Sequence, residues 1–169
     1  MLVSKYGGRD AFLKTFNPDY QRKICDSQDL CFFGDYPTIT DTRLAYGKNA
    51  PVMWLVPQLY NLSEYCGCRD KLQGKPLEEC AFVISTEFRY LKISELMLFF
   101  YRFKTGRYGR FYGSVDPLII TESLRKFCDE RWCAYERHEQ ELMEKKEAGY
   151  RNGAVSYEEY QKLKQEGKI

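Results

Sequence analysis

Apolar residues recur through the middle of the chain at the spacing of one helix face. The first such run, at intervals of three and four residues, comprises Val52, Leu55, Val56, Leu59 and Leu62. Asn49 and Pro51 precede it and suit the start of a helix. Pro57 lies inside the run and has no backbone N–H, so we expect it to kink the helix or to restart it.

Two further runs repeat this spacing. One follows Pro76, a residue suited to the first turn of a helix, and comprises Leu77, Cys80, Ala81, Ile84 and Phe88. The other begins at Ser94, which we expect to cap the helix, ends at Gly106, and comprises Leu96, Phe99, Phe100 and Phe103. Each run predicts a helix with one buried face.

A long helix is predicted to begin at Asp116 and Pro117, which combine a capping carboxylate with a proline in the first turn. Its first apolar face comprises Ile120, Leu124 and Phe127. After Trp132 the sequence "YERHEQELMEKKEAG" is charged nearly all round, which is typical of a helix that faces solvent or a partner.

The two ends of the chain are patterned less clearly. "GRDAFLKTF" and "NPDYQRKIC" each predict a short helix, "FFGDYP" a turn-rich link, and "TITDTRLAYGKN" a brief helix closed by Gly47. "NGAVSYEEYQKLKQEG" predicts a turn and a short helix, with Ser156 and Glu159 as its capping box.

These elements together predict an all-α fold. We expect a single compact helical domain, residues 1–169, with about five to seven helices. Residues 1–45 would form an irregular N-terminal cap or arm and residues 49–131 the core helices. Residues 132–169 would form the charged helix and the short C-terminal helix.

Composition narrows the class of protein. The formal net charge is +2, which gives no general attraction to nucleic acid or membranes, so an electrostatic partner must meet a local patch. Seven scattered cysteines and an N-terminus without an apolar stretch indicate a reduced, cytoplasmic protein. The longest apolar run covers six residues, whereas a membrane span needs about 20, so no membrane span is expected.

No complete catalytic or metal motif is present. The one histidine, His138, lies in the charged part of the last long helix, where solvent is expected on both sides. Cys66 and Cys68 form a single tight pair, whereas zinc sites need two such pairs or their equivalent. We therefore expect no enzyme activity, no catalytic or metal site and no cofactor.

One segment, "RFKTGRYGRFYG", combines positive charge with aromatic rings and contains no acidic residue. Rings stack on bases and cations pair with phosphates, which is what a single strand of DNA or RNA requires. The predicted nucleic-acid-binding residues are Arg102, Lys104, Arg107, Tyr108, Arg110, Phe111 and Tyr112. Gly106 to Gly109 also match the short G-x-x-G link of KH domains.

Two other interpretations of this segment stay open. Gly106 can be a helix C-cap, and Gly109 and Gly113 can supply positive φ angles in a tight connection with the rings tucked beneath it. Rings and arginines are also favoured where one protein contacts another. The direction of the side chains of Tyr108, Phe111 and Tyr112 distinguishes these interpretations.

The stretch from about Ala45 to Arg131 resembles a family of small helical proteins from phages and mobile elements of gut Bacteroidota. The likeness is carried by "AYGKNAPVMWLV", "YLKISELMLFF", "FKTGRYGRFYG" and "DPLIITESLRKF". Its helical pattern is loosely similar to that of phage helicase loaders. The chain has no Walker A phosphate loop, which excludes an ATP-driven loader of the AAA+ kind.

The resemblance implies a non-enzymatic accessory protein of a phage or mobile element. We expect it to act in DNA replication by contacting single-stranded nucleic acid, a helicase, or both. The alternative is a protein–protein interaction or inhibitor protein, directed by the mobile element at a host defence or replication enzyme.

Overall fold

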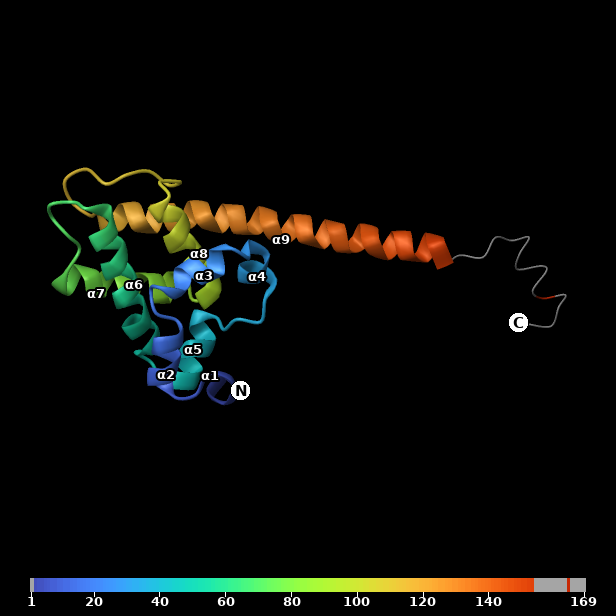
Figure 1. Ribbon diagram of the computed structural model, residues 1–169, viewed down its shortest axis with the longest axis horizontal. Helices are drawn as coiled ribbons and strands as arrows, with labels where there is room; N and C mark the ends of the chain where they lie inside the picture. Colours follow the sequence, from blue (N-terminus) through green and yellow to red (C-terminus); the bar gives the residue numbers. More distant parts are fainter. Residues whose placement is uncertain (1, 154–163, 165–169) are drawn as a thin grey trace. The chain divides into compact units, whose positions relative to one another are not determined.

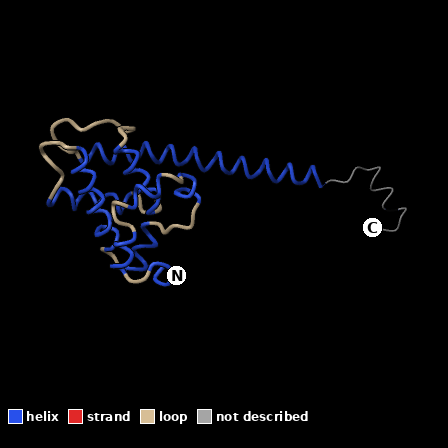
Figure 2. The backbone as a smooth tube through the Cα atoms, viewed as in Figure 1, coloured by secondary structure: helices blue, strands red, loops and turns tan. Residues whose placement is uncertain are grey.

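The computed structural model describes residues 2–153 and 164 of the chain (Figure 1). These residues form helices and no strand, so the predicted all-α fold is confirmed (Figure 2). In chain order the helices are α1 (Leu2–Tyr6), α2 (Arg9–Thr15), α3 (Tyr20–Cys25), α4 (Gln28–Phe33), α5 (Ile39–Tyr46), α6 (Ala50–Cys66), α7 (Gly74–Glu87), α8 (Ile93–Lys104) and α9 (Pro117–Gly153).

Contacts along the chain group it into two units, residues 1–131 and 132–169. The prediction of a single domain stays a prediction. None of the described helices combines the length and the apolarity that crossing a bilayer requires.

Helix α8 forms the centre of the first unit. Every residue from Ile93 to Phe100 is fully buried. The helix packs against α3, α4 and α6. A helix enclosed on all sides must be apolar nearly all round, which explains the run "LMLFF" within it.

The first 45 residues are more helical than predicted. Helices α2 and α3 lie where the two short helices were expected, and α5 ends before Gly47 as expected. The expected turn-rich link from Phe32 is wrong in part, because α4 includes Phe32 and Phe33. Helix α4 has six residues, which is too short to give a helical period in the sequence.

This N-terminal region is fixed to α6 by buried polar side chains. The backbone carbonyl of Phe16 accepts hydrogen bonds from Trp54 Nε1 at 2.8 Å and from Gln58 Nε2 at 2.9 Å. Gln58 Oε1 in turn accepts from Gln21 Nε2 at 2.6 Å. All three side chains are buried. The region is therefore part of the packed body and not a free arm.

Helix α6 continues through Pro57 as one element, so a restart at this residue is excluded. Pro57 is exposed, and its ring therefore costs the helix a backbone hydrogen bond without disturbing the buried face. Helix α7 begins at Gly74, two residues before Pro76. Its predicted apolar face is confirmed, since Leu77, Cys80, Ala81, Ile84 and Phe88 are buried.

The predicted N-cap of α8, Ser94, is wrong. The cap is Lys92, whose backbone N–H donates to Glu95 Oε2 at 2.8 Å. Ser94 is buried inside the helix and donates its hydroxyl to the carbonyl of Cys31 at 2.8 Å. The hydroxyl that resembled a cap in the sequence instead satisfies a backbone carbonyl next to the core.

Helix α9 begins as predicted. Asp116 Oδ1 accepts the backbone N–H of Leu118 at 2.8 Å, and Pro117 is the first helical residue. The expected apolar face is fully buried and comprises Ile120, Leu124 and Phe127. From Trp132 to Ala148 no described side chain is buried. The predicted capping box at Ser156 and Glu159 lies outside the described residues.

Candidate nucleic-acid interface

Three glycines shape the loop between α8 and α9. Gly106, Gly109 and Gly113 have φ angles of 81°, 111° and 78°, which side chains larger than hydrogen rarely adopt. Beyond Gly109 the chain runs beside the loop that follows α6. The N–H of Asp70 donates to the carbonyl of Gly113 at 3.1 Å, and the N–H of Val115 donates to the carbonyl of Asp70 at 2.9 Å. Backbone geometry therefore accounts for the glycines.

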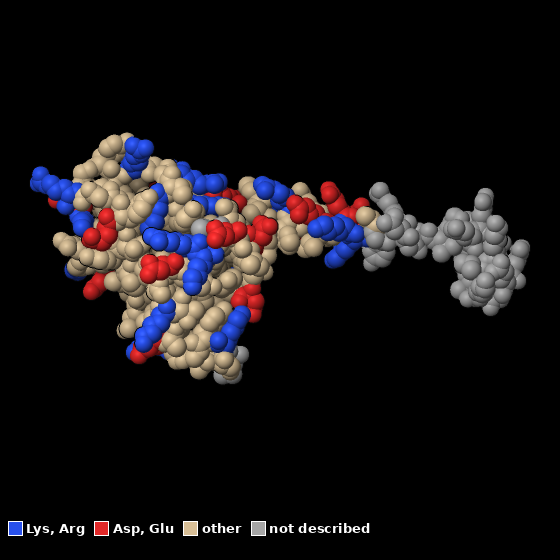
Figure 3. All heavy atoms as spheres, in the orientation of Figure 1, with Lys and Arg blue, Asp and Glu red and all other residues tan. Residues whose placement is uncertain are grey.

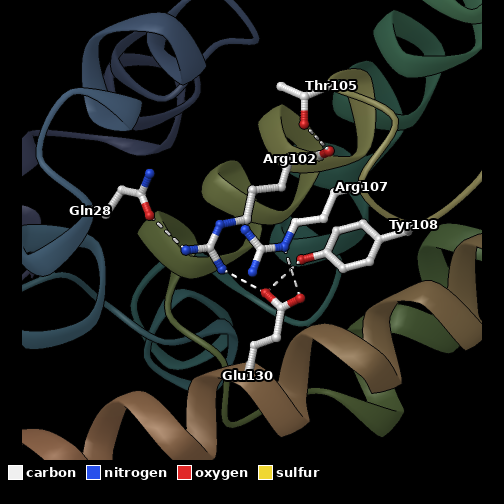
Figure 4. A network of polar contacts seen from close by, with 6 residues as sticks. All are labelled: Gln28, Arg102, Thr105, Arg107, Tyr108 and Glu130. Carbon is white, nitrogen blue, oxygen red and sulfur yellow. Dashed lines mark hydrogen bonds and ion pairs between the residues drawn. The ribbon is translucent and has the colours of Figure 1, made fainter.

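A single carboxylate, that of Glu130, anchors this loop to α9 (Figure 4). Glu130 Oε2 accepts from Arg102 Nη1 at 2.8 Å and from the hydroxyl of Tyr108 at 3.1 Å. Glu130 Oε1 accepts from Arg107 Nε at 2.9 Å. Three donors from both sides of Gly106 thus converge on one acidic side chain.

Arg102 is a cation of the core and not a surface group. Its side chain is 12% exposed, and Nη2 donates to Gln28 Oε1 at 2.7 Å. The guanidinium carbon lies 5.7 Å from the ring centre of Phe32 and 5.8 Å from that of Phe127. Its Nε is buried without a hydrogen-bond partner. Arg102 therefore joins α4, α8 and α9 and has no surface to offer a ligand.

The three rings that were to decide the role of the loop point in different directions. Tyr108 is buried, with ring centres 5.5 Å from Phe99 and 6.2 Å from Phe103. Burial, followed by the nearby charge of Glu130, raises the pKa of its hydroxyl. Phe111 is half-buried and stacks on Phe103 at 5.2 Å. Only Tyr112 points outward, with 87% of its surface exposed.

Lys104 is also withdrawn from the surface. Its Nζ donates to Gln21 Oε1 at 2.7 Å and to Asn61 Oδ1, and it lies 5.7 Å from the ring centre of Tyr65. Burial, followed by the positive charge of Arg22, lowers the pKa of this amine. The side chain stands in a pocket between α3, α6 and α8, whose lining includes Thr105 at the start of the loop but none of the three loop glycines.

The exposed groups that remain belong to two adjacent loops. Arg110 and Tyr112 are exposed, and the side chain of Arg107 is 51% exposed although it contacts Glu130. Arg69, 91% exposed, directly precedes the residue that pairs with Gly113 and Val115. Figure 3 shows Lys and Arg spheres along the edge that these loops form in Figure 1. We call Arg69, Arg107, Arg110 and Tyr112 the loop edge.

The other candidate groups lie apart. His138 is half-exposed in the second unit. Cys66 and Cys68 are half-exposed free thiols, and burial raises the pKa of Cys66. The described residues contain no group of three or more His, Cys, Asp or Glu side chains arranged to hold a metal ion.

Glu130, the residue that organises the loop, was not predicted from the sequence. Its signal is its position: Glu130 follows Phe127 by three residues and therefore flanks the apolar face of α9. An acid at the margin of a buried face requires a cationic partner, and the segment 102–112 offers several. Arg69 was not predicted either. It lies beside the glycine loop because its neighbour Asp70 pairs with the backbone of Gly113 and Val115, and no local sequence pattern reveals that pairing.

Comparison with known proteins adds a family but no function. No curated protein and no solved structure matches the chain. Residues 73–168, which are more than half of the chain and include the glycine loop and Glu130, match the model of a family of unknown function, DUF6633. The chain therefore belongs to this family.

Proposed function

We propose that this protein binds single-stranded nucleic acid through the loop edge, as a non-enzymatic accessory protein of DNA replication in a phage or mobile element. The observation that carries the proposal is Tyr112, a ring that is 87% exposed between Arg110 and a glycine. An exposed ring contributes little to the stability of the fold, whereas a base that stacks on it contributes about 1–3 kcal/mol to the binding free energy.

The charges around this ring support the proposal. Arg69 and Arg110 flank the paired backbone of the two loops, and neither is held by the Glu130 network. Arg69 Nε forms an exposed ion pair with Asp70 Oδ1 at 3.8 Å, and an ion pair in solvent contributes little, so both guanidinium groups can pair with phosphates on either side of a base stacked on Tyr112. Of the seven residues that the sequence suggested, three are kept in the loop edge, because Arg102, Lys104 and Tyr108 serve the interior and Phe111 stacks on Phe103. Arg69 is the fourth residue of the loop edge and was not among the seven.

Fluorescence anisotropy with a labelled oligo-deoxythymidine that lacks a 5′-phosphate tests the proposal. The double variant Arg69→Ala/Arg110→Ala should weaken binding and lower the slope of log K against log salt by about 1.4, since each phosphate contact on a single strand contributes about 0.7. The charge-matched control is Lys14→Ala/Lys48→Ala, two exposed lysines on α2 and after α5. Equal losses in both double variants would contradict the proposal.

The stacking contribution has its own pair of variants. Tyr112→Phe keeps the ring and should retain binding, whereas Tyr112→Leu keeps apolar surface without a ring and should weaken it about 5- to 100-fold. Equal affinities of the two variants would show that Tyr112 does not stack on a base. Neither variant touches the core, so both are expected to fold.

A second candidate function, binding of another protein, is favoured by a separate observation. Phe82 and Val83 on α7 are 59% and 42% exposed, and large apolar side chains side by side on a surface are favoured at protein interfaces. A helicase or another phage or host protein held there would be released by Phe82→Ser but not by the Arg69→Ala/Arg110→Ala variant. Pull-down with each variant separates the two candidate functions.

A further inference from the structure

Lys104 lies in the wall of a partly open pocket of about 280 Å³. The pocket is lined by residues before and within α3, on α6 and at the end of α8: Pro18, Asp19, Gln21, Arg22, Asn61, Tyr65, Tyr101, Lys104 and Thr105. Its volume is at the lower end of small-molecule sites, which span about 300–1,000 Å³. Two tyrosine rings and several converging polar groups are the usual lining of such a site.

The charge of Lys104 is not compensated by an ion pair. Its two hydrogen-bond acceptors are the amide oxygens of Gln21 and Asn61, and its contacts among the described residues include no carboxylate within ion-pair distance. The ammonium group of lysine has three N–H donors, so one remains for a ligand. A half-buried ammonium ion without a counter-ion is costly for the fold, and a bound anion removes that cost.

Arg22 brings a second cation into the lining of the pocket. After burial, Arg22 is the strongest influence that lowers the pKa of Lys104, whereas Cys66 and Asp19 raise it less. Asp19 belongs to the same lining and opposes the effect of Arg22 on this pKa. A second cation close to an uncompensated lysine is the arrangement that binds an anion carrying more than one negative charge.

We propose that this pocket binds a phosphate monoester, whose phosphate lies against Lys104 and Arg22. A phosphate monoester carries a charge of about −1.5 to −2 at neutral pH, which matches two cations. Lysine binds phosphate as a point charge and arginine binds it through its planar fork. The rings of Tyr65 and Tyr101 leave an apolar wall for the organic part of the ligand. The inference does not depend on the loop edge.

Isothermal titration calorimetry on the full chain tests this inference with three probes: adenosine 5′-monophosphate, inorganic phosphate and adenosine. The monophosphate should bind, inorganic phosphate should bind more weakly, and adenosine should not bind measurably. Lys104→Met keeps the apolar stem and removes the charge, and it should lower the affinity for the monophosphate at least tenfold. Lys126→Met, an exposed lysine on α9, is the matched control and should bind as the wild type does.

The inference is overturned by any of three results. The monophosphate does not bind at millimolar concentration, adenosine binds as tightly as its monophosphate, or Lys104→Met leaves the affinity unchanged. Circular dichroism of Lys104→Met confirms that it folds, and Arg22→Gln provides a second variant with the same expected loss should it not. Because the oligonucleotide used for the loop edge has no 5′-phosphate, failure at one site does not affect the result at the other.

A second titration distinguishes the sources of the phosphate. If the natural ligand is the end of a strand, a 5′-phosphorylated oligo-deoxythymidine should bind the wild type more tightly than its unphosphorylated form. Lys104→Met should abolish that difference. If the ligand is a free nucleotide, the two strands should bind equally and the monophosphate should still bind at the pocket.

Discussion

Glu130 shows how one side chain can determine the role of several others. Sequence alone suggests that Arg102, Arg107 and Tyr108 contact a ligand, since they are cations and a ring between glycines. Each of them instead donates to the carboxylate of Glu130. The three donors lie 22 to 28 positions before Glu130 in the sequence. No local pattern therefore reveals that they contact this acid and not a ligand.

Glu130→Gln should destabilise the first unit by about 1–3 kcal/mol. The amide accepts only through one oxygen, so at least one of the three donors loses its partner, and the buried part of Arg102 loses its counter-charge. Urea denaturation followed by circular dichroism measures the change. Glu122→Gln, at an exposed position on the same helix, should alter stability by less than about 0.5 kcal/mol.

Equal denaturation midpoints for Glu130→Gln and Glu122→Gln would contradict the anchoring role of Glu130. The same pair of variants also reports on the loop edge. Because Arg107 loses its fixed position in Glu130→Gln, the glycine loop should exchange its backbone hydrogens faster in that variant alone.

Cys80 makes the free energy of unfolding depend on pH in the alkaline range. The thiol is 3% exposed on α7, and burial raises its pKa from the ordinary 9.0 to about 11. The unfolded chain loses this proton near pH 9 and the folded chain only near pH 11, so the contribution of Cys80 is complete below pH 9 and is lost as pH rises to 11. Two pKa units correspond to about 3 kcal/mol at most.

Denaturation of the wild type and of Cys80→Ala at pH 8 and pH 11, under reducing conditions, isolates this contribution. The wild type should lose about 2–3 kcal/mol more stability over that interval than the variant, since the tyrosines and lysines titrate in both proteins. Cys133→Ala removes an exposed thiol and should show the pH dependence of the wild type. A pH dependence of Cys80→Ala equal to that of the wild type would refute the assignment.

At the scale of elements, apolar spacing was sufficient to locate the long helices. Helices α6, α7, α8 and the start of α9 all lie on predicted runs, because each buries a face longer than two turns. Helix α4 was not predicted, since six residues cannot show a period. The cap of α8 was misplaced, because Ser94 is used by the carbonyl of Cys31, 63 positions away. Elements defined by local spacing were therefore predictable, and those defined by distant partners were not.

Pro57 destabilises α6 locally without interrupting the helix. It is exposed in the interior of the helix and withholds the N–H that the carbonyl four residues earlier would accept. Pro57→Ala should therefore stabilise the protein by about 1–3 kcal/mol, the difference between the two residues inside a helix. Thermal denaturation at fixed pH measures the gain.

Pro76→Ala is the matched control for this prediction. Pro76 is also exposed, but it is the third residue of α7, where the N–H has no partner within the helix. Its replacement should change stability by less than about 0.5 kcal/mol. Were both alanine variants to shift the midpoint equally, the gain would not come from the helix interior.

At the scale of the whole molecule, the chain consists of a packed unit and a unit whose described part is one exposed helix. Among the side chains that the structure describes, the last buried apolar residue is Phe127, and the division between the units falls after Arg131. Glu95 marks this boundary, since it is fully buried and holds Arg131 Nε at 2.7 Å. The buried polar and apolar side chains described for the first unit therefore all lie before residue 132.

Limited trypsin digestion should cut the chain first beyond Arg131. Arg137, Lys145 and Lys146 are on α9 without buried contacts, and cleavage requires a segment that opens locally at little cost. Mass spectrometry should show a stable fragment that retains residues 2–131. First cuts at Lys23, Arg89 or Lys126 would mean that the packed unit opens as readily as the exposed helix.

The convergence of three donors on Glu130 has a consequence for the whole family. A carboxylate that serves two arginines cannot change charge unless they change with it, so positions 102, 107 and 130 should co-vary among family members. Positions 110 and 112 are exposed and contact no such partner among the described residues, so the Glu130 network does not restrain them. If residue types at 110 and 112 vary freely across the family, the loop has only a structural role. If a basic residue at 110 and an aromatic ring at 112 are conserved, the loop binds a ligand throughout the family.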